Sequence, residues 1–336
     1  MPNFSSIGWR YARCGPLVNV LKKEAFDIVP SNDHVVVEVL RAPLHRVDTA
    51  VINGTVLGRN RLQLSAFPRV GGSEGVGRVV ATGGVKTLKQ GDTVWVAPLN
   101  GTWATRIAVH HSMVHKIDPK YVLLAVSASN FLVAQHLLNG FVQLQKGQVV
   151  LQNGGSSVTS LAVSAIAKSI GVKVLTVSTP GERFNDSKKR HAEYGSEVFE
   201  CNGSGARAVR HVLGNAGVAL YLNATGGRHF DTFLGFVGSR GHVVSYGAQS
   251  GSGLMMSGSN FIFNEITMNG LFLPSYIKSL SYNVRQTQLE FVLQRLYSMG
   301  FSYPTTVAAS LEDMPGVWDC VFVHGGTKGV VIPNKE

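Results

Sequence analysis

The sequence lacks the features that would anchor the chain in a membrane or cross-link it covalently. No apolar run reaches the roughly 18 residues that a spanning helix needs, and the most apolar stretches, such as Tyr121–Val126, are only about a strand long. The three cysteines are widely spaced, at Cys14, Cys201 and Cys320. We therefore expect no membrane span, no disulfide framework and no structural zinc, and a reducing compartment fits this cysteine usage.

Acidic residues are also scarce, with 20 Asp and Glu against 31 Lys and Arg, so the formal net charge is +11. This balance favours polyanionic partners, although an organelle whose proteins are basic, or an anionic cofactor, explains it equally well. The longest basic run is only Lys188–Arg190. Any contact with RNA would therefore use a dispersed basic surface.

The amino-terminal segment contains no acidic residue before Glu24 but has Arg10, Arg13 and Lys22–Lys23. This composition is typical of a mitochondrial targeting segment, and we predict a location in the mitochondrial matrix. Because Trp9–Tyr11 is already expected to form the first strand, such a segment would be very short. A basic terminus on a cytosolic protein remains the alternative.

Two patterns divide the chain into an α/β protein with two domains. Residues 1–121 show short strands separated by glycine and proline turns, which predicts a partly open β-barrel. In residues 122–272, a long helix over Val126–Phe141 is followed by alternating strands and helices, which requires a doubly wound parallel sheet covered on both faces. Residues 273–336 are expected to return to the first domain through a strand at Lys328–Ile332. Ser250–Asn260 is expected to be a surface loop.

Three stretches of the first domain have an order and spacing that are typical of one protein family: Gly71–Gly77, Leu88–Val94 and Gly101–Val109. Together with Gln152–Asn153 and Asn223–Gly227, they make the chain resemble the medium-chain dehydrogenases/reductases. The resemblance is closer still to the mitochondrial trans-2-enoyl thioester (enoyl-acyl-carrier-protein/CoA) reductases, and it covers nearly the whole chain. It implies a GroES-like barrel, a Rossmann-type domain and NADPH as cofactor.

The same resemblance implies that no metal is bound. Zinc-dependent relatives have a His before the Glu of the glycine-rich turn, where this chain has Ser73, and the four-cysteine lobe of those relatives is absent. The eleven histidines, His110, His111 and His115 among them, show no spacing that suggests a replacement site. We predict no metal site.

A glycine- and serine-rich turn after the first strand of the Rossmann-type domain is the expected phosphate cradle, because helix amides would face a pyrophosphate there. In the relatives, small glycines stand where this chain has Val158 and Ser160, so their side chains would crowd the phosphates. A turn that merely caps the helix is the alternative. The predicted cofactor contacts, weak or vestigial, are Asn153, Gly154, Gly155, Ser156, Ser157, Arg183, Asn223, Gly226 and Gly227.

The residue expected to bind the 2′-phosphate of NADPH also departs from the pattern of the relatives. An Arg normally follows the second strand, but here only Arg183 could serve, and Pro180–Gly181 and Glu182 precede it. Selective binding of NADPH is therefore in question, and no cofactor is certain.

The proton donor of the relatives is a Tyr, and aligning Ile52–Thr55 with their turn puts Val56 in its place. No Tyr occurs between Tyr11 and Tyr121, so we predict no catalytic residue at this position. Trp103 stands where the relatives have a Trp that lines the substrate pocket, although an aromatic residue in a strand is more often part of the core.

These departures, together with the basic charge, lead to two hypotheses. The first is a non-catalytic reductase homologue, a pseudoenzyme that serves as a structural or assembly component of a mitochondrial protein or ribonucleoprotein complex, with the mitochondrial ribosome as the leading candidate. The alternative is a zinc-independent, NADPH-dependent trans-2-enoyl thioester reductase of mitochondrial fatty-acid synthesis. Because the relatives dimerise through the nucleotide domain, a homodimer using Glu265–Leu271 as an edge strand is compatible with both.

Overall fold

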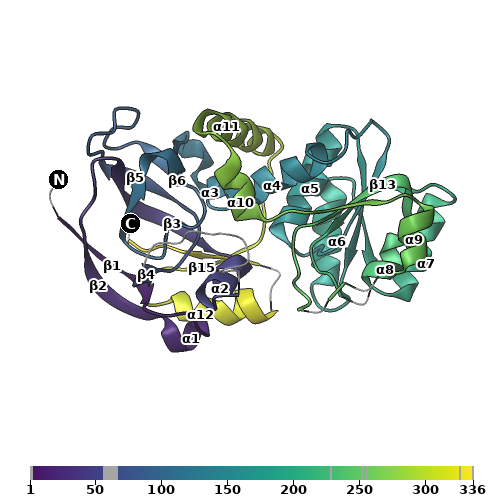
Figure 1. Ribbon diagram of the computed structural model, residues 1–336, viewed down its shortest axis with the longest axis horizontal. Helices are drawn as coiled ribbons and strands as arrows, with labels where there is room; N and C mark the ends of the chain where they lie inside the picture. Colours follow the sequence, from purple (N-terminus) through teal and green to yellow (C-terminus); the bar gives the residue numbers. More distant parts are fainter. Residues whose placement is uncertain are drawn as a thin grey trace. The chain divides into compact units, whose positions relative to one another are not determined.

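The computed structural model describes residues 3–55, 67–227, 229–251, 253–254, 256–324 and 327–334. The chain divides into two compact units (Figure 1). The barrel unit comprises Met1–Ser129, Ile277–Tyr297 and Ser302–Glu336, and the sheet unit comprises Asn130–Tyr276 with Ser298–Phe301.

The barrel unit is built from short strands and few helices. Its strands are β1 (Phe4–Tyr11), β2 (Lys22–Ile28), β3 (His34–Leu44), β4 (Arg69–Val70), β5 (Gly75–Ala81), β6 (Thr93–Val96), β7 (Arg106–His110), β8 (Val114–Lys116), β15 (Thr305–Ala308) and β16 (Lys328–Val331). Its helical segments are α1 (Leu17–Val20), α2 (Arg46–Ile52), α3 (Val122–Ala125), α11 (Tyr282–Ser298), α12 (Met314–Trp318), the 3-10 turns His111–Met113 and Pro119–Tyr121, and the π-helical turn Asp319–His324.

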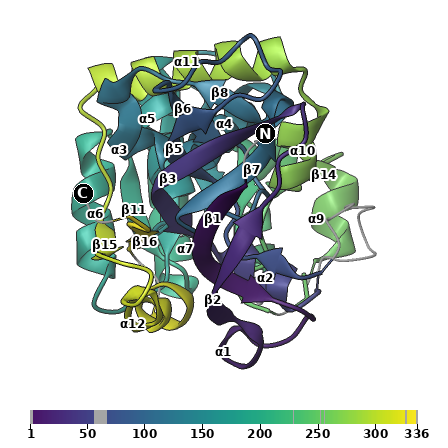
Figure 2. The same cartoon turned by 90° about the vertical axis from the view of Figure 1, so that its left-hand side faces the viewer.

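One strand order explains how the carboxyl-terminal residues reach this unit. The main sheet runs β15-β16-β3-β5-β6-β8, with β7 paired to β3, and a smaller sheet runs β2-β1-β4. Figure 2 shows β1 and β2 of the smaller sheet side by side. β16 is antiparallel to β3, with Gly329 opposite Leu44 and Val330 opposite Pro43. The side chain of Lys328 is thereby brought beside the end of β3, where α2 begins.

The sheet unit has six parallel strands with helices between them. The strands are β9 (Val149–Gln152), β10 (Lys173–Ser178), β11 (Glu197–Glu200), β12 (Val218–Asn223), β13 (Val237–Ser245) and β14 (Thr267–Gly270). The helices are α5 (Val158–Ser169), α6 (Phe184–Glu193), α7 (Gly203–Leu213), α8 (Phe230–Leu234) and α9 (Gly258–Phe263), while α4 (Ala128–Asn139) and α10 (Leu273–Ser279) join the two units.

The order of these strands is β11-β10-β9-β12-β13-β14, so the connections reverse direction between β9 and β12. Figure 1 shows α5 and α6 on one face of the sheet and α7 and α8 on the other. Nearly every residue of β9, β10 and β12 is buried, because helices cover both faces. The predicted combination of a GroES-like barrel with a doubly wound Rossmann-type sheet is confirmed.

Two local predictions differ from the structure at their ends. The helix expected over Val126–Phe141 is α4, which is shorter and covers Ala128–Asn139, and the amide of Ser129 in its first turn donates to the Glu74 carboxylate. The loop expected over Ser250–Asn260 ends early, because α9 begins at Gly258.

Within the described residues, no single helix is long and apolar enough to cross a membrane. Pro119–Ala125 and Ala128–Asn139 are together long and apolar enough for a membrane span, but the two segments are bent by 74° relative to each other.

Candidate active site

A cavity of about 520 Å³ opens at the carboxyl ends of β9, β10 and β12 in the sheet unit. This is where the strand order reverses, the place at which open parallel sheets bind ligands, and the volume suits a ligand of moderate size. The cavity is lined by Gly154, Val177, Thr179, Cys201, Thr225, Gly226, Gly227, His229, Ser250, Gly253 and Leu254. None of these lining residues carries a carboxylate, so the cavity is compatible with an anionic ligand.

Two buried asparagines shape the loops beside this cavity. The Oδ1 atom of Asn153 accepts the backbone N–H groups of Ala224 and Thr225 at 2.6 and 3.2 Å. Its Nδ2 atom donates to Asn223 Oδ1 at 2.7 Å, and that oxygen also accepts the N–H of Gly226 at 3.0 Å. Asn153 and Asn223 therefore hold the loops in place and do not line the cavity themselves.

The amino-terminal end of α5 is held by its own serines. Ser157 accepts the N–H of Ser160 at 3.1 Å, which caps the helix. The hydroxyl of Ser160, which is fully buried, lies 3.0 Å from the carbonyl oxygen of Gly154. Ser160, which stands where the relatives have a glycine, therefore stabilises the turn by donating a hydrogen bond to its backbone.

The five residues predicted to cradle the phosphates are Asn153, Gly154, Gly155, Ser156 and Ser157. Of these, only Gly154 lines the cavity. Its φ of +71° and the 3.0 Å that would separate a Cβ from Ala224 Cβ both favour glycine. Gly155 is packed inside, where a Cβ would lie 2.8 Å from Thr176 Cγ2, and Ser156 is exposed. Of the other four, Asn153 and Ser157 stabilise the turn through their hydrogen bonds.

Arg183 precedes α6 and is not among the residues that line the cavity. Glu182 is exposed and lies outside the lining as well. The second strand instead ends at Ser178, and Thr179 reaches the cavity. An acidic residue at this place usually selects NAD through the ribose 2′-hydroxyl. With Thr179 there, no carboxylate opposes a 2′-phosphate.

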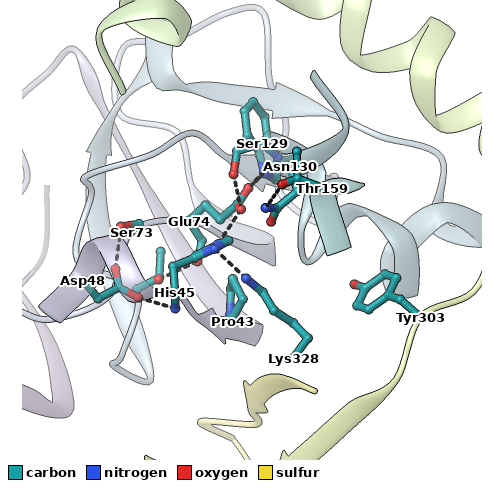
Figure 3. Close-up of polar contacts among 12 residues, drawn as sticks. Pro43, His45, Asp48, Ser73, Glu74, Ser129, Asn130, Thr159, Tyr303 and Lys328 are labelled. Carbon is teal, nitrogen blue, oxygen red and sulfur yellow. Dashed lines mark hydrogen bonds and ion pairs between the residues drawn. The ribbon is translucent and has the colours of Figure 1, made fainter. Parts of the chain in front are cut away.

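A second polar group of residues lies inside the barrel unit, around Glu74 (Figure 3). The Oε1 atom of this fully buried carboxylate accepts from His45 Nε2 at 2.7 Å and from the hydroxyl of Ser129. Its Oε2 atom accepts from Trp95 Nε1 at 2.8 Å and from the amide of Ser129 at 3.0 Å. Four donors therefore satisfy both oxygens, which allows the charge to be buried.

The network continues from His45 to Lys328 and Asp48. Lys328 Nζ contacts His45 Nδ1, so the imidazole bridges an ammonium and a carboxylate. Asp48, in the first turn of α2, accepts the backbone N–H of His45 at 2.6 Å and the hydroxyl of Ser73. We call His45, Asp48, Ser73, Glu74 and Lys328 the buried polar network.

Burial and hydrogen bonding act in opposition on its charged groups. Burial alone would raise the pKa of Glu74, but the hydrogen bonds from His45 and Ser129 outweigh burial and hold that pKa below its ordinary value. Burial raises the pKa of Asp48. Burial lowers the pKa of Lys328 to about 8, although Glu74 and Asp48 oppose this effect.

Trp103 lies in the core of the barrel unit. Its ring is fully buried, and its indole N–H donates to the carbonyl oxygen of Pro43 at 3.1 Å. A Cβ on Gly71 or Gly72 would lie 2.6 Å from the indole ring, so both glycines are needed for its packing. Val56, the predicted replacement for the tyrosine of the relatives, lies outside the described residues.

Across the described parts of the chain, no group of three or more His, Cys, Asp or Glu side chains is arranged to hold a metal ion. Ser73, at the position of a zinc ligand in zinc-dependent relatives, instead donates to Asp48.

Both units match family models. The model described as "Alcohol dehydrogenase GroES-like domain" matches residues 31–119, and the one described as "Zinc-binding dehydrogenase" matches residues 159–293. The enoyl-acyl-carrier-protein reductase, mitochondrial, of Arabidopsis thaliana is 29% identical over 299 residues, which cover 87% of this chain and 77% of that protein. The protein of the same name from Rattus norvegicus is 30% identical over 270 residues, covering 78% and 70%.

The chain belongs to the mitochondrial enoyl-acyl-carrier-protein reductase family. This family lies within the medium-chain dehydrogenase/reductase superfamily, as the resemblance implied. Among solved structures, the mitochondrial 2-enoyl thioester reductase Etr1p/Etr2p heterodimer from Candida tropicalis has a TM-score of 0.82 at 20% identity, covering 98% of this chain and 100% of that one. A putative NADPH:quinone reductase from Bacillus thuringiensis has a TM-score of 0.86 at 18% identity, with the same coverage. At these identities the two structures support the fold of this family member.

The buried polar network of this reductase homologue is not evident from the sequence alone. Glu74 and Ser73 lie in the glycine-rich turn that carries the family resemblance, but their partners come from residues 45, 48, 129 and 328. The available signal was a pair of acidic residues within otherwise apolar segments, Asp48 before Val51–Ile52 and Glu74 before β5. Neither residue showed which partner would neutralise it.

Proposed function

We propose that this protein is a mitochondrial, zinc-independent reductase that uses NADPH to reduce 2-enoyl thioesters. The observation that carries the proposal is the cavity at the reversal of strand order, lined by Gly154 and Thr225–Gly227 and free of carboxylates among its lining residues. The names of the relatives, which match across both units, support the substrate class and the compartment.

The residues of the sheet unit fit an anionic dinucleotide. Gly154 gives the backbone room beside Ala224, and α5 directs its first amides toward the turn, where a pyrophosphate is favoured. Thr179 would face the 2′-phosphate, while Gly226 and Gly227 would lie along the remainder of the cofactor. When bound, NADPH supplies a hydride to the β-carbon of the enoyl group.

The non-catalytic hypothesis, in which the protein is a structural component of the mitochondrial ribosome, receives less support. None of the relatives named above is a ribosomal or assembly protein. What remains in its favour is the net charge of +11 and the valine at position 56. The charge is explained equally well by an anionic cofactor or by an acidic acyl-carrier partner.

Two measurements on the purified protein test the proposal. NADPH should bind saturably, as seen by its fluorescence, and crotonyl-CoA should then cause loss of its near-ultraviolet absorbance at about one turnover per second or faster. The variant Thr179→Glu should weaken NADPH binding about tenfold or more while leaving NADH binding nearly unchanged, because a carboxylate opposes only the 2′-phosphate.

Absence of saturable NADPH binding, or binding without any crotonyl-dependent oxidation, would count against the proposal. Co-sedimentation with mitochondrial ribosomes that weakens steeply as salt rises would then favour the non-catalytic hypothesis, since phosphate contacts release counterions.

A further inference from the structure

Helix α6 contacts the turn between β9 and α5 through two side chains that the proposed function does not yet use. We propose that Ser187 and His191 of α6 are positioning residues for the cofactor. By holding the carbonyl oxygen of Gly155, they keep the amide of Ser156 turned outward, where it donates to the pyrophosphate of NADPH. This inference rests on the proposed use of NADPH and deepens it.

Two buried donors of α6 converge on one oxygen of the turn. The hydroxyl of Ser187 lies 2.9 Å from the carbonyl oxygen of Gly155, and Nε2 of His191 lies 2.7 Å from the same oxygen. Ser187 is 4% exposed and His191 is fully buried. Because a carbonyl oxygen has two lone pairs, these two donors satisfy it completely.

The imidazole of His191 is itself held in the orientation that this contact needs. A carbonyl oxygen can only accept, so Nε2 carries the proton and Nδ1 accepts from the hydroxyl of Ser164 at 2.8 Å. Ser164 in turn accepts from the side-chain amide of Gln152 at 3.1 Å. Burial lowers the pKa of His191 to about 4, so the ring is neutral at physiological pH. Hydrogen bonds that begin in β9 therefore fix the ring.

Peptide geometry then sets the direction of the next amide. In a trans peptide, the C=O group and the N–H group of the following residue point in opposite directions. Because the carbonyl of Gly155 points to α6, the N–H of Ser156 points away from that helix, and Ser156 is exposed. Within the described residues, this N–H has no acceptor in the protein. It is therefore available to a ligand.

The amides on either side of Ser156 are already occupied. The N–H of Gly155 donates to the carbonyl oxygen of Val177 at 3.2 Å, and the N–H of Ser157 donates to that of Gly154 at 2.9 Å. Ser156 also lies just before the first turn of α5, whose amino-terminal end favours negative charge. Since Gly154 lines the cavity, a pyrophosphate bound beside it supplies the acceptor that the Ser156 amide lacks.

The turn is packed too closely for its buried carbonyl to go without partners. A Cβ on Gly155 would lie 2.8 Å from Cγ2 of Thr176 and 3.0 Å from Cβ of Ser178, both in β10. Without the two donors of α6, the carbonyl of Gly155 would be buried and unpaired, which favours rotation of the peptide toward water. That rotation would turn the N–H of Ser156 inward, away from the ligand.

The test removes both donors and follows the phosphates of NADPH separately. The double variant Ser187→Ala/His191→Met of the whole chain should bind NADPH about tenfold or more weakly, because a charge-assisted hydrogen bond to the pyrophosphate is lost. At saturating NADPH, phosphorus NMR of the bound cofactor should show altered pyrophosphate resonances and an unaltered 2′-phosphate resonance. The kcat at saturation should change less than about threefold, since only binding is affected.

Two variants serve as matched controls. Ser187→Ala/His191→Gln keeps a side-chain N–H close to the position of Nε2, and its affinity for NADPH should lie within about threefold of that of the unmodified protein. Ser169→Ala removes a hydroxyl that donates to the carbonyl oxygen of Ile166 at 2.6 Å, at the other end of α5. This variant should change neither the affinity nor the resonances.

A double variant with methionine that binds NADPH as tightly as Ser169→Ala overturns the inference and leaves the proposed function standing. A loss of affinity in which the 2′-phosphate resonance changes as much as those of the pyrophosphate, or in which none changes, also overturns it, since that is the result of a purely structural role. If the double variant does not fold, Ser187→Ala alone decides. It should weaken NADPH binding about threefold and alter only the pyrophosphate resonances, and equality with Ser169→Ala refutes the inference. An unmodified protein without saturable NADPH binding overturns the proposed function and the inference together.

Discussion

Replacing Glu74 with Gln should destabilise the barrel unit by about 3 to 5 kcal/mol. The carboxylate accepts from His45, Trp95 and twice from Ser129. Glutamine retains one acceptor oxygen, so two of these four donors would face an amide NH2 group instead. Each buried donor without an acceptor costs about 1 to 3 kcal/mol, and Lys328 also loses its counter-charge.

Urea unfolding followed by tryptophan fluorescence measures this change selectively. All four tryptophans, Trp9, Trp95, Trp103 and Trp318, lie in the barrel unit, so excitation near 295 nm reports on that unit alone. A loss of 4 kcal/mol would move the midpoint by roughly 2 M urea at an ordinary slope of about 2 kcal/mol per M. The control is Asp118→Asn, which removes an exposed partner of Lys120 and should leave the midpoint unchanged.

The pH dependence sharpens this prediction. The folded-state pKa of Glu74 lies below its ordinary value of 4.5, so its stabilising contribution is present above that pH and is lost as the pH falls further. The difference between the unmodified protein and Glu74→Gln should therefore narrow in acid. A variant within 1 kcal/mol of the unmodified protein at pH 7 would refute the assignment of Glu74 as the charged centre of the network.

Three further predictions concern single residues. Burial lowers the pKa of His191 to about 4, so the sheet unit should lose up to roughly 3 kcal/mol of stability as the pH falls from 6.5 to 4, and His191→Asn should remove this slope in hydrogen exchange. Gly72→Ala should cost more than about 2 kcal/mol and shift tryptophan emission to the red, because φ is +89° and the new Cβ would lie 2.6 Å from the ring of Trp103. Gly154→Val should weaken NADPH binding more than about tenfold in a fluorescence titration, because the side chain would crowd Ala224 at a φ of +71°; unchanged affinity would mean that the cofactor avoids this cavity.

The fold could be predicted because its signals are local. Strand and helix periodicity, with glycine turns between them, identifies the parallel sheet from its own residues, and the pairing then follows from the handedness of crossovers. The hydrogen bond from the Ser129 amide to the Glu74 carboxylate could not be found in this way. Its two partners lie 55 positions apart in the sequence.

The candidate site could be predicted only in part. Gly154, Gly226 and Gly227 lie two to four residues after the ends of β9 and β12, so their place at the cavity could be inferred from sequence position. Arg183 follows a strand as well but does not line the cavity. The approach of Lys328 to His45 depends on the antiparallel pairing of β16 with β3, which no local pattern in the chain reveals.

The buried polar network responds differently to partial and to complete replacement. Replacing a buried ion pair with apolar side chains of similar volume is often neutral or stabilising, since the cost of desolvating the charges falls away. Removing one partner alone leaves the others buried without compensation, which is the reason for the large effect expected of Glu74→Gln. Once Lys328, Glu74 and Asp48 are buried together, each of them therefore makes the loss of another costly.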